Sequence, residues 1–173
     1  MTNRAVAPAV AGDVTILREQ AKAIGGVLRA NTAGITHEES FLQPPGGGNC
    51  LNWIAGHLAS TWDVILPLVG QEPVLGKQAL QRYDRGTAEL HDPAEALPLE
   101  KLLAACDEAV KRLDEGLAHV APDALDRPAG FSPRNRADET VRSLLSAVVF
   151  HQAYHTGQTG LLRRLAGKPG AIR

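Results

Sequence analysis

Apolar residues recur at spacings of three and four along four stretches of the chain, which is the period of a helix with one buried face. The pattern predicts helices over about residues 13–30, 50–69, 99–117 and 138–167. Asn49 and Asp138 stand where side-chain caps of the second and fourth helices are expected. No stretch gives the alternating signal of a half-buried strand. We therefore expect an all-α chain folded as an antiparallel four-helix bundle with long loops.

Proline and glycine gather between these helices, in residues 43–49, 70–98 and 121–136. The second of these tracts is long enough to form a crossover with at most short helical turns. A chain of 173 residues can bury one sizeable core without disulfides. We expect residues 1–173 to form a single bundle domain, with residues 1–10 as a flexible N-terminal arm.

Composition and charge narrow the classes of function. A formal net charge of −1 and an aromatic content of 4% provide neither the positive field nor the stacking surface of a nucleic-acid-binding protein. Two cysteines without a C-x-x-C pattern argue against a disulfide framework and a zinc ribbon, and favour reduced thiols in the cytoplasm. No uncharged apolar stretch reaches 18 residues, so no membrane contact is expected.

Three histidines share the core-facing phase of two predicted helices. His151 and His155 are one helical turn apart and continue the apolar stripe of the fourth helix, and His57 falls in the apolar phase of the second helix. An imidazole on an apolar face needs partners for two nitrogens, so the group is either a metal site or a set of hydrogen-bonded core histidines. Three ligands would leave a coordination position open for water or substrate. Nitrogen ligands suit Zn, Ni, Cu or Fe, of which we favour Zn or Ni. Gln158 is placed to hydrogen-bond a metal ligand or its water, as a candidate cofactor-binding residue.

These segments carry a resemblance to a known family. The tract NWIAGHL at 52–58, the tract HQAYHTGQ at 151–158 and the helix start TVR at 140–142 are similar to the pattern of the DinB/YfiT-like superfamily. The resemblance implies a four-helix bundle in which His57, His151 and His155 bind one divalent metal ion. Members of that superfamily include transferases and isomerases that use small cellular thiols, and many others have no assigned reaction.

Two functions from different classes follow. The first is a metal-dependent thiol transferase, isomerase or hydrolase acting on a small thiol or electrophile, in which the open metal position generates the nucleophile. No Asp or Glu stands at helical spacing beside the histidines to act as a base, which argues against hydrolysis. The alternative is a non-catalytic, stress-associated bundle in which the metal joins two helices. Access from solvent to the metal would distinguish these two functions, since an enzyme needs a pocket that opens from the metal to solvent. A homodimer is a possible assembly for such a bundle.

Other polar and small residues have weaker interpretations. Cys50, at a helix N-terminus, is either a reactive thiol or a small buried apolar residue, and the second is commoner. Asp63 lies on the far side of its helix from His57 and is expected in solvent. Tyr154 is expected to pack with its hydroxyl in solvent. Gly157 and Gly160 interrupt a helix, which either close packing of a neighbouring helix or a substrate channel beside the metal would explain, and we favour close packing.

Overall fold

A computed structural model describes residues 9–172, and within them the chain is helical without a β-strand. Five α-helices form, α1 (Ala9–Thr32), α2 (Leu51–Ile65), α3 (Lys77–Leu80), α4 (Leu99–His119) and α5 (Val141–Leu165). Five short 3₁₀ helices join them, η1 (Glu39–Phe41), η2 (Leu66–Val69), η3 (Gln81–Tyr83), η4 (Pro93–Glu95) and η5 (Pro122–Leu125). The all-α class is therefore confirmed. Five rather than four α-helices are counted within the described residues, because the predicted connection over residues 70–98 includes the four-residue α3, one of the short helical turns expected there.

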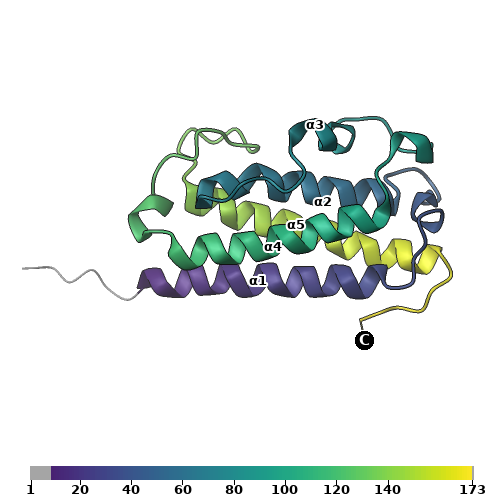
Figure 1. Cartoon of the computed structure of the whole chain (residues 1–173), viewed down its shortest axis with the longest axis horizontal. Helices are drawn as coiled ribbons and strands as arrows, with labels where there is room; N and C mark the ends of the chain where they lie inside the picture. Colours follow the sequence, from purple (N-terminus) through teal and green to yellow (C-terminus); the bar gives the residue numbers. More distant parts are fainter. Residues whose placement is uncertain (1–8, 173) are drawn as a thin grey trace, which may run out of the picture.

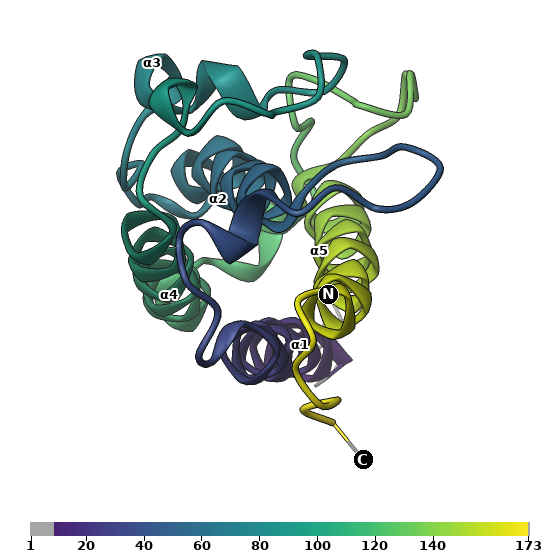
Figure 2. The same ribbon diagram turned by 90° about the vertical axis from the view of Figure 1, so that its right-hand side faces the viewer.

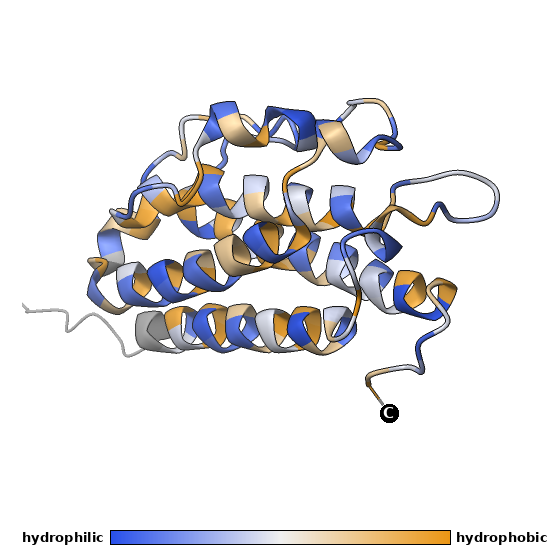
Figure 3. Cartoon of the chain, turned by 45° about the vertical axis from the view of Figure 1, so that its right-hand side comes forward, coloured by the Kyte–Doolittle hydropathy of each residue, from blue (hydrophilic) through white to orange (hydrophobic). Residues whose placement is uncertain are grey.

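The four long helices lie side by side, with α1 and α2 each in contact with both α4 and α5 (Figures 1 and 2). Figure 3 shows apolar and polar residues alternating along these helices, as amphipathic helices require. The segment between α2 and α4, which contains α3 and η3, runs over the outer side of α2 (Figure 2). This segment forms one side of the candidate site described below.

The predicted helix ends differ from the observed ones. Of the arm expected over residues 1–10, residues 1–8 lie outside the described residues, and α1 already includes Ala9 and Val10. Neither predicted cap is used. Cys50 is the N-cap of α2 and makes no side-chain cap hydrogen bond. Thr140 caps α5, because its side chain accepts a hydrogen bond from the backbone N–H of Ser143 in a capping box.

The α5 cap lies two residues after Asp138 because an ordered turn precedes it. Thr140 is paired with Pro128 in an isolated antiparallel bridge, which keeps its backbone extended. Glu139 is buried at 5% exposure and forms an ion pair with Arg134 at 2.6 Å, and hydrogen-bonds the Ser143 hydroxyl. These contacts fix the start of α5, and with it the register of the helix that carries two of the histidines.

Asp63 is not in solvent as expected, since it is only 6% exposed. Its carboxylate accepts hydrogen bonds from the backbone N–H groups of Val74, Leu75 and Gly76 at 2.8, 2.9 and 2.8 Å. The outer face of α2 is covered by the chain that follows it, which helical phase does not reveal. Charge-assisted hydrogen bonds of this kind are strong, so Asp63 ties the segment before α3 to α2.

No helix within residues 9–172 is long and apolar enough to cross a lipid bilayer.

Candidate metal centre

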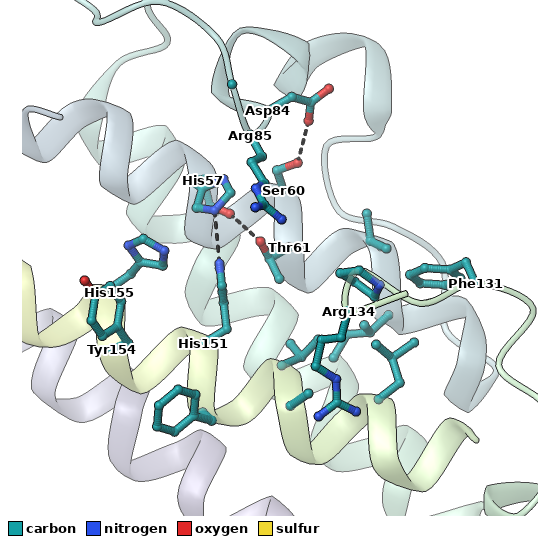
Figure 4. A pocket seen from close by; sticks show the side chains of 18 of the residues that line it. His57, Ser60, Thr61, Asp84, Arg85, Phe131, Arg134, His151, Tyr154 and His155 are labelled. Carbon is teal, nitrogen blue, oxygen red and sulfur yellow. Dashed lines mark hydrogen bonds between the residues drawn. The ribbon is translucent and has the colours of Figure 1, made fainter. Parts of the chain in front are cut away.

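Three histidines from two helices meet at one point in the molecule. His57 lies near the middle of α2, and His151 and His155 lie one turn apart on α5. One ring nitrogen from each lies within 4.8 Å of the other two. Figure 4 shows the His57 and His151 rings directed at each other, with His155 beside them. The three candidate ligands predicted from the sequence are thus brought together.

A buried hydrogen bond sets the position of α5 against α2 beside this group. Gln152 is fully buried, and its side-chain amide donates to the backbone carbonyl of Leu58 on α2 at 3.0 Å. Because Gln152 follows His151 and Leu58 follows His57, this bond holds the two histidine-bearing turns together. The Trp53 ring also stacks on His57, with 4.8 Å between ring centroids.

Hydrogen bonds determine which nitrogen His57 and His155 present to the centre. His57 Nδ1 lies 2.9 Å from the backbone carbonyl of Tyr83, and a carbonyl can only accept, so Nδ1 carries the proton and Nε2 keeps its lone pair. His155 Nδ1 likewise donates to Gln158 Oε1 at 2.7 Å. Gln158 therefore contacts a candidate ligand as expected, although it accepts the bond rather than donating it. Such contacts orient metal-binding imidazoles in proteins.

The geometry fits a metal ion. His57 Nε2 and His151 Nε2 are 3.1 Å apart, close to the spacing of about 3.3 Å that bonds of about 2.0–2.1 Å give around a tetrahedral ion. His151 Nδ1 is buried without a hydrogen-bond partner in the described part of the chain. The three residues could therefore hold one metal ion through three nitrogens.

Burial keeps these imidazoles neutral. It lowers the pKa of His151 to about 4, with smaller contributions from the neighbouring His155 and His57. Burial also lowers the pKa of His57 and of His155. Neutral rings have the free lone pairs that metal coordination needs at neutral pH.

The three histidines lie on the wall of an open pocket of about 1150 Å³. The chain has two Trp, two Tyr and three Phe, and four of these side chains line the pocket, Trp53, Phe131, Phe150 and Tyr154. Tyr154 is 59% exposed, and its ring meets the edge of His155 at 5.1 Å between centroids. It is therefore a pocket residue as well as a packing residue.

Two charged residues of the pocket were not predicted from the sequence. Asp84 and Arg85 come from the segment after η3 and line the same pocket as the histidines (Figure 4). Among described residues, Asp84 is the only carboxylate in the lining. The two residues have no helical period, and Tyr83 brings them to the site through its carbonyl contact with His57. No local sequence signal marks that contact.

The remaining candidates are structural. Cys50 is fully buried, its thiol lies 3.5 Å from the Leu90 carbonyl, and burial raises its pKa, which favours the apolar interpretation. A Cβ on Gly160 would lie 3.4 Å from the Asn31 side chain, so close packing holds there. A Cβ on Gly157 would have no neighbour within 4 Å in the part of the chain that the structure describes, so close packing does not explain that glycine.

Comparison with known proteins gives a family and a fold. The DinB superfamily matches residues 21–159 of the chain. The structure is similar, with a TM-score of 0.67, to the crystal structure of a conserved protein from Enterococcus faecalis, which is 20% identical. The similarity covers 89% of this chain and 97% of that one, and at this identity it establishes the fold alone. No curated protein matches the sequence.

Proposed function

The chain belongs to the DinB superfamily, and from that premise we propose that it is a metal-dependent enzyme acting with a small thiol. His57, His151 and His155 would hold one divalent transition metal ion, with Zn or Ni favoured. The reaction is an S-transfer or an isomerisation. The observation that carries the proposal is that three neutral imidazoles, two of them oriented by hydrogen bonds, lie together on the wall of an open pocket.

The set of donors supports the choice of metal and of thiol. Imidazole nitrogens suit Zn and Ni and disfavour Mg and Ca, which need oxygen ligands. The group contains three protein ligands among the described residues, so a coordination position remains for a substrate. A divalent metal ion held by these histidines would lower the pKa of a thiol in that position, so that the thiol is present as a thiolate at neutral pH.

The residues of the chain supply orientation and proton transfer. The Tyr83 carbonyl and Gln158 hold His57 and His155 with their Nε2 atoms turned inward. Trp53 and Tyr154 provide ring faces and edges against which an apolar substrate can lie. Asp84, whose carboxylate accepts a hydrogen bond from Ser60 at 3.3 Å, is our candidate acceptor for the thiol proton.

The pocket distinguishes this proposal from a non-catalytic bundle in which metal only joins α2 and α5. A metal ion that only joins two helices does not need to be reached from solvent. Here, however, the histidines border a pocket with room for a small molecule. An open, largely apolar pocket beside a metal site is the arrangement expected of an enzyme.

The test uses protein loaded with Zn, incubated with 2-mercaptoethanol or glutathione and 1-chloro-2,4-dinitrobenzene. A new S–C bond forms, chloride leaves, and the thiol proton passes to the protein and then to solvent. We expect a rate above that of protein treated with a chelator, and a loss of that excess in His57→Ala. Equal rates for a wide panel of thiols and electrophiles, with and without bound Zn, would contradict the proposal.

A further inference from the structure

The charged side chains around the pocket differ in how they are partnered. Arg134 forms an ion pair with Glu139 and also donates to the Ser143 carbonyl. Asp84 accepts a hydrogen bond from Ser60. Arg85 is exposed and makes no hydrogen bond or ion pair within residues 9–172. The pocket therefore holds one guanidinium whose five donors are all free.

The position of Arg85 brings its charge close to the candidate metal centre. Figure 4 shows its side chain beside Ser60 and His57, on the side of the pocket formed by the segment after η3. Its positive charge contributes to the lowered pKa of both His57 and His151. A ligand group bound at Arg85 would thus lie near a molecule held at the histidines.

We propose that Arg85 binds the carboxylate of a singly charged, amphiphilic substrate whose apolar part lies against the aromatic lining of the pocket. This proposal rests on the proposed function, and it adds the chemical class of the substrate. A planar guanidinium matches a carboxylate with two parallel hydrogen bonds, which a lysine could not make.

The surrounding charges select a monoanion. Among the residues that the structure describes, Arg85 is the single unpaired cation of the pocket lining, and it can balance one negative charge. Asp84 lines the same pocket and repels ligands with more negative charge, such as a phosphate dianion.

The apolar part of the substrate is indicated by exposed aromatic side chains. Phe131 is 41% and Phe150 is 74% exposed, and both line the pocket together with Trp53. Large apolar side chains left in solvent around a pocket are typical of a ligand-binding surface. A ligand with an apolar body would cover them and gain binding energy from their burial.

The test compares two probes of equal shape, 4-phenylbutyrate and 4-phenylbutyramide, by calorimetric titration. Wild-type protein is expected to bind the carboxylate about tenfold more tightly than the amide, as one charge-assisted pair in a partly exposed site allows. In Arg85→Gln the preference is expected to disappear while affinity for the amide stays the same. Arg29→Gln, which removes an exposed arginine of α1, is the matched control and should keep the preference.

Three outcomes overturn the proposal. They are equal affinities of wild-type protein for the two probes, a preference that survives in Arg85→Gln, and tighter binding of phenyl phosphate than of 4-phenylbutyrate. Because Arg85 is exposed and unpartnered, Arg85→Gln should unfold at the same temperature as wild-type protein.

Titrations of Zn-loaded and chelator-treated protein separate this proposal from the proposed function. Direct binding of the carboxylate to Zn would give a preference that needs the metal and persists in Arg85→Gln, which overturns the role of Arg85. A preference that depends on Arg85 in protein unable to bind Zn would support the anion site and contradict the metal-dependent function.

Discussion

Gly56 is the position where a single methyl group should disturb both the fold and the candidate metal centre. A Cβ at this position of α2 would lie 2.1, 2.3 and 2.4 Å from the Cδ1, Cγ and Cε1 atoms of Tyr83. Tyr83 is 1% exposed, and its hydroxyl donates to Asn52 and accepts from the backbone N–H of Leu97. The backbone carbonyl of the same residue orients His57. Gly56→Ala must therefore displace the residue that holds a candidate ligand.

The magnitude follows from the contacts. Carbon atoms approach to about 3.5–4.0 Å, so the Tyr83 ring must move by about 1.5 Å. Overpacking of a core costs about 1–3 kcal/mol, and two strained hydrogen bonds cost about 1 kcal/mol each. Replacing glycine by alanine inside a helix stabilises the folded state by about 1 kcal/mol, which offsets part of this cost. We expect Gly56→Ala to lower the free energy of unfolding by about 2–4 kcal/mol and to weaken metal binding about 10- to 100-fold.

Gly157 provides the matched control, since it lies inside α5 and a Cβ there would have no neighbour within 4 Å. Gly157→Ala should raise stability by up to about 1 kcal/mol. Urea unfolding of chelator-treated protein measures both changes, and competition with a chromophoric chelator measures Zn affinity. Equal stability of the two variants would refute the packing of Tyr83 on Gly56. A destabilised Gly56→Ala with unchanged Zn affinity would refute the link to His57.

Three further predictions concern contacts around the bundle. Asp63→Asn should lower the free energy of unfolding by about 2 kcal/mol, since the amide offers one acceptor oxygen to three backbone N–H groups; an unchanged urea midpoint would count against that anchor. Gln158→Leu should weaken Zn binding about tenfold in a chelator competition because His155 loses its acceptor, and wild-type affinity would show that the contact has no such role. Asp114 lies beside Arg18 and Lys22, which hold its pKa at about 2, below its usual 3.8. Its stabilising effect is present above pH 4 and is lost as the pH falls towards 2, so the stability difference between wild type and Asp114→Asn should narrow over that range. A constant difference in urea unfolding at pH 5 and pH 2.5 would argue against this pairing.

The sequence predicts what depends on helical period. The spacing of apolar residues locates the long helices, and the same phase correctly turns His57, His151 and His155 towards one another. The contact between His155 and Gln158 also follows from spacing, because residues three apart share a helix face.

What depends on contacts between distant segments could not be predicted. The period assigns Asp63 to the outer face of α2, but it cannot show that residues 74–76 cover that face and donate to its carboxylate. Asp84 and Arg85 reach the pocket because Tyr83 packs against Gly56, a contact across 27 residues with no periodic signal. The observed start of α5 differs from the predicted one for a similar reason, since a bridge between Pro128 and Thr140 fixes where the helix begins.

Metal analysis of the purified protein tests the central claim most directly. Protein prepared without a nickel column should contain about one divalent transition metal ion per chain, and His57→Ala, His151→Ala and His155→Ala should each lose it. The control is His91→Ala, which replaces an exposed histidine outside the pocket and should keep the metal. Metal content that is the same in all four variants and in wild-type protein would contradict the account.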